Sequence, residues 1–443
     1  MATTDPKADH TPTGLATATN EPEGYDVEAI RAHFPSLSQE IHGHPLVYLD
    51  TAASAQRPRP VTEAMERFER SSYANVHRGV HELSQRATAA YEAARARVAR
   101  FLGAADPHEI VFVRGTTEGL NLVAWSWGRQ NVGAGDVIVV SEMEHHSNLV
   151  PWQLLCAERG AEVRVLPVDD AGDLRLDELD RLLDPTPSGG RVKAVAVTHV
   201  SNSLGTINDV AEIARRAHQT GALVVVDGAQ GAPHLPVDVD ALGCDFYAFS
   251  GHKAYGPSGI GALWGRRELL EAMPPWQSGG GMIARVSFAG TTFAGVPERF
   301  EAGTPSIVGA VGLAAALDFL DGIGLDAIGA WEHALVERAV ERLAPVPGLR
   351  LVGTGSEVLR PSKGRARRAA IVSFLLAQAH AHDVGTFLDR EGIAVRTGHH
   401  CNQPLMDHYG IPSTSRASFG LYNTPEEVDR LAAALHRISE FFG

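Results

Sequence analysis

Cysteine is scarce in this sequence, and its spacing matches no common framework. The chain of 443 residues has three cysteines, Cys156, Cys244 and Cys401, which are scattered along it. Three widely spaced cysteines predict neither a disulfide framework nor a CxxC metal pair, and this usage favours a reducing, cytoplasmic location. Cys156 lies in a helix-like segment and Cys244 precedes an apolar strand, so we interpret both as buried small hydrophobic residues.

Long apolar runs and clusters of basic charge are also missing. No run of about 18 apolar residues is present, so no membrane span is expected. The formal net charge is −14 and no stripe of arginine and lysine occurs, which argues against a nucleic acid partner. The short basic segment at 362–368 is interpreted as a solvated loop. Residues 1–24 are polar and lack the apolar core of a signal peptide, which favours a disordered tail.

The common nucleotide-binding motifs are absent as well. No GxGxxG follows a predicted strand, which disfavours a dinucleotide site. Gly115-Thr116-Thr117 stands between a β-branched strand at 110–113 and helix-favouring residues, but neither GKS nor GKT follows, so it is not a Walker loop. Free backbone N–H groups at a helix start, with two hydroxyls beside them, bind phosphate well. Threonine also caps helices for purely structural reasons, so the motif alone leaves both interpretations open.

What the sequence does have is an alternation of strand-like and helix-like segments. Continuous Val/Ile/Leu runs between helical segments predict an α/β domain with a mostly parallel sheet, and the chain length predicts two or three domains. From about residue 325 amphipathic helices predominate, which predicts a smaller α+β domain. We expect a segment at 25–45 that packs on the small domain, a large domain at 46–322 and a small domain at 323–443. Strands are predicted at 46–49, 110–113, 137–140, 163–169, within 193–209, at 221–226 and at 369–376, and helices at 27–33, 60–73, 84–102 and 306–320.

Polar side chains follow several of these strands. Asp227 and Gln230 come directly after the strand at 221–226, and Asn202 lies in the loop after the preceding strand. Open α/β sheets bind ligands at the carboxyl ends of their strands. A carboxylate at such a position costs desolvation energy unless a cation meets it. A turn-capping aspartate is the alternative.

One lysine stands at the end of another apolar run. The run ends in Ser250-Gly251-His252-Lys253, and a Gly/Pro-rich turn follows at once. A lysine that acts as an amine nucleophile needs partial desolvation and neighbours that lower its pKa below the free value of about 10.4. Small residues, a hydroxyl and an imidazole provide such a setting. The alternative is an ordinary surface lysine in a turn.

Two histidine pairs could suggest a metal site. His145 and His146 follow the strand at 137–140, but nothing nearby in the sequence completes a ligand set. His399 and His400 precede Cys401, and two adjacent histidines beside one cysteine rarely converge on one ion. We therefore expect no resident metal.

Taken together, these residues are what a pyridoxal phosphate enzyme requires. A lysine forms a Schiff base with the cofactor aldehyde, and a carboxylate keeps the pyridine nitrogen protonated, which makes the ring an electron sink. The chain resembles the fold-type I, class V aminotransferase-fold enzymes, and within them the SUF-pathway (group II) cysteine desulfurases. The resemblance implies a large domain with a mostly parallel seven-stranded-type sheet. It runs from about 46 to 424 and rests on the motifs NVHRGVHELS, RGTTEGLNLVA, EHHSNLVPW, SNSLGTIN, VVDGAQ, DFYAFSGHKAYGPSGIG, FEAGTP, VRTGHHCNQPLM and RASFGLYNT.

The resemblance implies a role for each matching residue. Lys253 holds the cofactor and moves protons at the substrate Cα, Asp227 pairs with the pyridinium nitrogen, and Gln230 bonds the ring hydroxyl oxygen. His145 stacks on the ring. The phosphate is expected on Thr116, Thr117, Ser250 and His252, with Thr304 from the other subunit of a homodimer.

The substrate side is implied in the same way. Asn202 and Arg416 hold the carboxylate of L-cysteine, for which an arginine fork is suited. Arg396 and His77 line the entrance or the cavity. The thiolate of Cys401 attacks the substrate sulfur and keeps a persulfide while alanine leaves. Because a free thiol has a pKa near about 8.5, nearby cationic groups should help, and His399, His400 and Arg396 are candidates by proximity in the sequence.

The resemblance also implies partners and leaves alternatives. Sulfur would pass to an acceptor protein for iron–sulfur cluster assembly. His382 matches a histidine implicated in transiently capturing the zinc of a sulfurtransferase-type acceptor, although a surface histidine at a helix start is the alternative. The tail and the insertion at 355–368 depart from the pattern and leave partner docking open. A selenocysteine lyase, a class V aminotransferase or epimerase that makes no persulfide, and a degenerate fold that only binds a partner remain competing functions.

Overall fold

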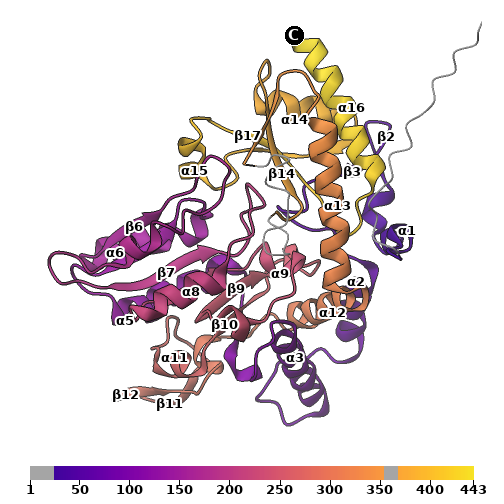
Figure 1. Cartoon of the computed structure of the whole chain (residues 1–443). Coiled ribbons are helices and arrows are strands. Elements are labelled where there is room, and N and C mark those ends of the chain that lie inside the picture. The colour runs from indigo at the N-terminus through magenta and orange to yellow at the C-terminus, as the bar shows by residue number, and fades with distance from the viewer. Residues whose placement is uncertain (1–23, 354–367) are drawn as a thin grey trace, which may run out of the picture.

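The computed structural model of the protein describes residues 24–353 and 368–443. A large layered unit built on a central sheet lies on one side, and a smaller group of strands and helices from the C-terminal part lies on the other (Figure 1). The tail expected at 1–24 and the insertion at 355–368 fall almost entirely outside the described residues.

The central sheet has seven strands in the order β4-β10-β9-β8-β7-β5-β6. All its pairs are parallel except those that β10 makes with β4 and β9. This arrangement confirms the predicted mostly parallel sheet of seven strands. The strands are β4 (Ile110–Val113), β5 (Val137–Ser141), β6 (Glu162–Leu166), β7 (Val192–Thr198), β8 (Leu223–Asp227), β9 (Phe246–Ser250) and β10 (Gly261–Gly265).

Helices bury both faces of this sheet, which explains why its strands are continuous apolar runs. On one face the alternate residues Val224 and Val226 belong to a core shared with α3, α8 and α12. On the other face Val225 belongs to a core shared with α4, α6 and α11. The helices are α3 (Glu82–Phe101), α4 (Thr116–Val123), α6 (Val150–Arg159), α8 (Val210–Gln219), α11 (Arg267–Ala272) and α12 (Ile307–Ile323).

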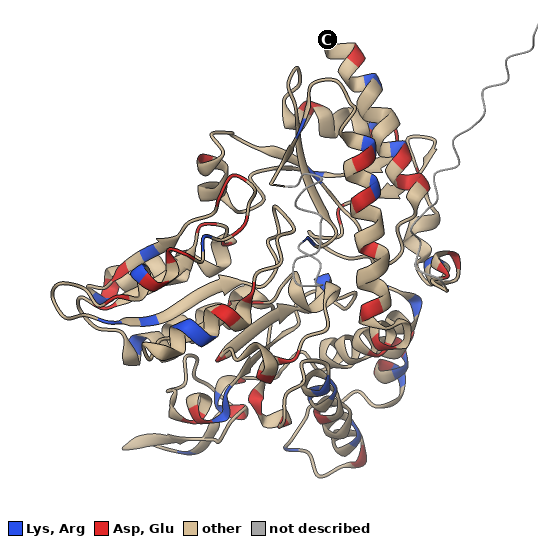
Figure 2. Ribbon diagram, viewed as in Figure 1, with Lys and Arg blue, Asp and Glu red and all other residues tan. Residues whose placement is uncertain are grey.

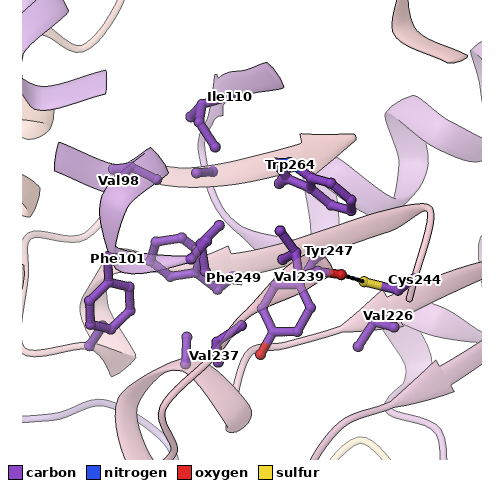
Figure 3. Close-up of a cluster of buried hydrophobic side chains, with 14 of the residues drawn as sticks. Val98, Phe101, Ile110, Val226, Val237, Val239, Cys244, Tyr247, Phe249 and Trp264 are labelled. Atoms are coloured by element: carbon purple, nitrogen blue, oxygen red, sulfur yellow. Dashed lines mark hydrogen bonds between the residues drawn. The ribbon is translucent and has the colours of Figure 1, made fainter. Parts of the chain in front are cut away.

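Figure 3 shows part of the first core, in which Val98 and Phe101 of α3 lie near Phe249 of β9. Burying each such side chain stabilises the fold by about 1.5–3 kcal/mol relative to leaving it exposed. Cys244 is fully buried there, with its thiol 3.9 Å from the carbonyl of Val239. Cys156 is buried as well. Both thiols are therefore packing residues, as predicted.

The C-terminal part has a sheet and a core of its own. Its four strands are in the order β13-β14-β17-β16. A separate apolar cluster joins this sheet to α13, α14 and α16. The division of the chain at 322 stays a prediction. The elements are α13 (Leu325–Leu343), β13 (Leu349–Val352), β14 (Ile371–Leu376), α14 (Ala381–Arg390), β15 (Ile393–Ala394), β16 (Arg396–Gly398), α15 (Gln403–His408), β17 (Thr414–Ser418) and α16 (Pro425–Phe442).

The N-terminal segment packs on this C-terminal part. The predicted strand at 46–49 is the short β3 (Val47–Tyr48), which pairs in parallel with β15 rather than with the central sheet. Tyr25 stacks on Trp331 of α13 with ring centroids 4.9 Å apart. The elements before the central sheet are α1 (Val27–Arg31), β1 (Glu40–Ile41), β2 (His44–Pro45), β3 and α2 (Arg59–Ser71).

The described helices are not individually suited to cross a membrane, three of the longest carry charges of both signs, and short elements connect the layers. In the described part of the chain no single helix is long and apolar enough to cross a membrane, and α12 with α13 meets those criteria only as a pair bent by 75°. Figure 2 shows acidic and basic residues interspersed along α3, α13 and α16. The short connecting elements are α5 (Arg129–Asn131), α7 (Leu179–Leu183), α9 (Gly231–His234), α10 (Val239–Leu242), β11 (Ile283–Ser287) and β12 (Gly290–Phe293).

Candidate active site

A cavity of about 300 Å³ lies where the central parallel strands end. The pairing of Thr198 with Asp227, and of Asp227 with Ala248, brings the carboxyl ends of β7, β8 and β9 level with one another. The segments that follow these strands therefore meet at one edge of the sheet. Of the residues predicted for the site, the cavity is lined by Thr116, Thr117, His145, Asn202, Asp227, Gln230, Ser250, His252, Lys253, Arg396, Cys401 and Arg416.

Lys253 and Asp227 form the electrostatic centre of the cavity. Asp227 is the last residue of β8, is 4% exposed, and accepts a hydrogen bond from the Ala229 N–H at 2.9 Å. Burial raises the pKa of Asp227, and the charge of Lys253 opposes that rise. Burial likewise lowers the pKa of Lys253, against the opposing charge of Asp227. A lysine brought closer to neutrality is the form that attacks an aldehyde.

The start of α4 forms a cradle for an anion. The Thr116 N–H donates to Ser250 Oγ at 2.9 Å, and the two hydroxyl oxygens lie 2.8 Å apart. The Thr117 hydroxyl lies 2.7 Å from Ser147 Oγ. The N-cap residue of α4 is Gly115, which has no side chain to cap the helix, and a Cβ there would come within 3.0 Å of Ser250 Oγ, so glycine keeps the cradle open. Hydroxyls beside a helix N-terminus suit a phosphate group.

Two histidines at the cavity are neutral. Burial, together with the charge of Lys253, lowers the pKa of His145 to about 3 and that of His252 to about 4. His145 Nδ1 accepts the Ser147 N–H at 3.0 Å, which leaves its other nitrogen protonated. An uncharged ring of this kind can stack on a planar group without a desolvation penalty for charge.

Gln230 provides the test of whether a pyridoxal ring fits. The side chain is 2% exposed, and its amide nitrogen donates to the Ala52 carbonyl at 2.6 Å. Among the described residues its Oε1 has no hydrogen-bond partner. A buried acceptor without a donor is costly, and a ring hydroxyl would satisfy it. With Asp227, Lys253 and the phosphate cradle, the residues present fit pyridoxal phosphate.

The predicted carboxylate-binding residues are joined by one that the sequence analysis missed, Asp50. Arg416 lies on β17, is 3% exposed, and donates to the Asn202 carbonyl at 2.8 Å and to Asp50 at 3.3 Å. Arg396 pairs with the same carboxylate at 3.0 Å. Arg416 Nε is buried without a partner in the described structure. It is therefore available to a substrate carboxylate.

Cys401 lies on an exposed loop between β16 and α15. His400 and Cys401 have φ values of 52° and 54°, and such left-handed conformations cost of the order of 1–3 kcal/mol each for residues with a Cβ. The Cys401 N–H donates to His399 Nδ1 at 3.2 Å. The loop is thus held in a strained shape that points its cysteine at the cavity.

The proposed charge assistance by His400 is wrong. His400 is buried, and burial together with the charges of Arg416 and Arg396 lowers its pKa to about 2. A neutral imidazole cannot stabilise a thiolate by charge. Lys253 and Arg416, whose charges do interact with Cys401, come from other parts of the sequence.

Two predicted residues lie outside the cavity of the single chain. His77 is exposed and pairs with Glu92 at 2.9 Å, so the chain alone does not bring it to the cavity as expected. Thr304 is exposed in the loop before α12, and its expected role from a second subunit stays a prediction.

The histidine considered for a partner's zinc, His382, lies elsewhere on the surface. It is exposed at the start of α14 and donates its N–H to His380. Within the described ranges no group of three or more potential ligands could hold a metal ion.

A second buried carboxyl group, Glu144, was also missed. It is 1% exposed and accepts hydrogen bonds from Asn148 at 2.7 Å, from the Thr198 N–H at 2.8 Å and from the Ser141 hydroxyl. Burial raises its pKa to about 8. It ties the segment of His145 to the ends of β5 and β7. Its only sequence signal is its place after a predicted strand, beside two more conspicuous histidines.

Comparisons with known proteins agree with this geometry. The model of the family "Aminotransferase class-V" matches residues 47–431. The chain is 55% identical over 420 residues to a cysteine desulfurase of Klebsiella pneumoniae (strain 342), which covers 95% of this chain and 100% of that protein.

Solved structures give the same result. The cysteine desulfurase CsdA from Escherichia coli is similar at 42% identity with a TM-score of 0.84, covering 95% of this chain and 100% of that one. A cysteine desulfurase from Thermococcus onnurineus NA1 is similar at 42% identity with a TM-score of 0.86, covering 94% and 98%.

Proposed function

Because this chain belongs to the class-V aminotransferase family and is a pyridoxal phosphate-dependent cysteine desulfurase, we propose that it carries the sulfur of L-cysteine as a persulfide on Cys401. One observation supports this proposal most directly. The Cys401 thiol lines the same cavity as Lys253 and Arg416, although it comes from an exposed loop of the C-terminal part.

The residues of the cavity divide the work. Arg416, assisted by Asn202, orients the substrate carboxylate through its partnerless Nε. Bound pyridoxal phosphate supplies an electron sink at the substrate Cα, which Asp227 sustains by holding a proton on the ring nitrogen. Lys253, with its pKa lowered by burial, is placed to accept and return the Cα proton.

The sulfur transfer itself balances without another reactant. The Cys401 thiolate forms a bond to the substrate sulfur while the substrate Cβ–S bond breaks. A proton takes the place of sulfur on the substrate carbon, so the products are alanine and a persulfide on Cys401. The attacking form of the cysteine is its thiolate, and the Cys401 side chain lines the same cavity as Lys253 and Arg416.

The test is mass spectrometry of the protein after exposure to L-cysteine. We expect the mass of one added sulfur atom on the peptide that contains Cys401, and no sulfur on Cys156 or Cys244, since those two thiols are buried and serve as controls within the chain. A Cys401→Ser variant should stay unmodified. Unchanged alanine release by that variant, with no sulfur on the parent protein, would reject the persulfide.

We further propose that the sulfur passes to a zinc-containing acceptor of the SUF pathway for iron–sulfur cluster assembly. His382 supports this, because its side chain is exposed at the start of α14 and free to meet a partner's metal. The acceptor should stimulate turnover of the parent protein more strongly than that of a His382→Ala variant. His44→Ala, at an exposed histidine of β2, gives the matched control, because His380 caps α14 by accepting the His382 N–H. Equal stimulation of all three would contradict a role for His382.

A homodimer that works in the cytoplasm completes the proposal. The exposure of His77 and Thr304 in the single chain supports a second subunit, since both were expected at an active site. Sedimentation should give twice the mass of the chain. If the protein is a dimer, mixing Lys253→Ala subunits with Thr304→Ala subunits should restore part of the activity that each lacks, because one intact site forms per mixed dimer.

A further inference from the structure

The loop that carries Cys401 rests on the segment that carries the ring-stacking histidine. The side-chain amide of Asn402 donates to the Met143 carbonyl at 2.9 Å. The His146 N–H donates to the carbonyl of Cys401 itself at 2.8 Å. The loop is thus held to the end of the central sheet by residues more than 250 positions away in the chain.

The ring of His146 makes a further contact at the start of α15. This helix begins at Gln403, and the side chain of its N-cap residue Asn402 makes no capping hydrogen bond. Helices leave their first N–H groups without partners inside the helix, and a side-chain acceptor normally satisfies one of them. Here the Gln403 N–H donates to His146 Nε2 at 3.2 Å. The imidazole of His146, from another segment of the chain, therefore caps α15 in place of the Asn402 side chain.

His146 thereby holds both sides of the cysteine. Its backbone binds the carbonyl of Cys401, and its ring binds the amide two residues later. Accepting at Nε2 requires a neutral ring, and burial together with the charge of His399 lowers the pKa of His146. The ring centroids of His146 and His399 lie 5.6 Å apart, with the ring planes inclined by 35°.

The loop needs such support because two of its residues are strained. His400 and Cys401 both have left-handed φ values, which residues with a Cβ leave readily when nothing holds them. We propose that His146 is the positioning residue for the Cys401 thiol and that its ring keeps the thiol directed at the substrate sulfur. This inference rests on the proposed persulfide role of Cys401.

Two substitutions at one position separate the acceptor from the ring. His146→Phe keeps the ring and the backbone N–H but removes the acceptor, whereas His146→Gln places an amide oxygen close to the former Nε2. Hydrogen exchange of the holoenzyme, read by mass spectrometry, should be at least about tenfold faster in the peptide spanning 399–403 of the Phe variant. Its kcat should fall between about 10- and 100-fold with little change in KM, because the thiol is misplaced while substrate binding is intact.

The Gln variant should recover most of both properties, and His44→Phe, at an exposed histidine in β2, should match the parent. Parental exchange and kcat in His146→Phe, or equal damage in the Phe and Gln variants, would overturn the inference. Failure of the proposed function has another signature. In that case Cys401→Ser would keep full desulfuration and no sulfur would load on Cys401, whatever the exchange rates show.

Discussion

The pocket around Lys253 and the loop around Cys401 face the same cavity, yet they are held in different ways. Asp227 ends β8 and Lys253 follows the neighbouring β9, in a sheet that is buried on both faces. Cys401 lies on an exposed loop whose shape depends on hydrogen bonds to a distant segment. The first region is fixed by packing, and the second by a few polar contacts.

The difference follows from what each group must do. An amine with a lowered pKa needs desolvation, which only a packed sheet edge provides. In the function proposed above, the thiol takes sulfur from a buried substrate and then offers it to another protein, so it must remain reachable from solvent. Loss of a buried group should therefore abolish cofactor chemistry, whereas loss of a loop group should spare the cofactor and affect only sulfur transfer.

Lys253→Ala should have the largest effect. It removes both the covalent anchor and the proton carrier, so alanine formation should fall by at least about 10³-fold. Reduction with borohydride should fix the cofactor to the parent protein and not to the variant. The assignment is easy to read, since the sequence has only four lysines. Cofactor trapped on Lys193 in place of Lys253 would contradict it.

Cys401→Ser should be nearly as damaging to desulfuration but should leave the pocket intact. We expect turnover to fall by about 10²-fold or more, because serine is a far weaker sulfur acceptor at neutral pH. The visible absorption of bound pyridoxal phosphate should be unchanged. A variant that loses this absorption would show that the two regions are not independent.

Arg416→Lys tests the substrate contact at the border between the regions. Lysine keeps the charge but loses the planar fork that reaches Asn202 and Asp50, so kcat/KM should fall by about 10- to 100-fold, mainly through KM. Arg396→Lys is the matched control, since Arg396 is exposed and should change kcat/KM only a few-fold. Equal effects of the two substitutions on kcat/KM would contradict the assignment of Arg416 as the residue that binds the substrate carboxylate.

The smallest expected effect is on folding stability and not on the reaction. It is a pH dependence of the free energy of unfolding that arises from a buried histidine in the packed region. His199 is 5% exposed, contacts Tyr247 OH at 3.1 Å, and burial lowers its pKa to about 4. An unfolded histidine takes up a proton below about pH 6.5 while folded His199 does not, so stability is lost as pH falls from about 6.5 to 4. His199→Asn should make this loss shallower by up to about 1.4 kcal/mol per pH unit. Urea unfolding across that range measures the slopes, and parallel profiles would contradict the assignment.

Much of the packed region could be predicted from the sequence, because continuous apolar runs reveal buried strands. The run at 110–113 is β4, Lys253 follows β9 as expected, and Asp227 stands at the carboxyl end of β8, as its last residue. The antiparallel strand β10 was not recognised, since GALWG has two glycines and no β-branched residue. Asp50 could have been found, because it also follows a predicted strand.

The loop region was less predictable, since its structure depends on contacts between remote residues. Nothing in the sequence near Cys401 indicates that His146 caps α15, since His146 lies 257 positions before Gln403 and 255 positions before Cys401. The expectation that His400 carries a positive charge was wrong, because the burial that keeps its ring neutral cannot be inferred from a polar loop sequence. His77 lies outside the cavity because Glu92 and the fold of one chain keep it at the surface.

The pairing of β3 with β15 has a consequence for biosynthesis. Val47 leaves the ribosome early, yet its partner Ile393 is made 346 residues later, which takes roughly 20–70 s at 5–20 residues per second. The ion pair of Asp50 with Arg416 waits even longer. The nascent chain can therefore form the central sheet first. The contacts that place Arg416 beside Asp50 form only when translation is nearly finished.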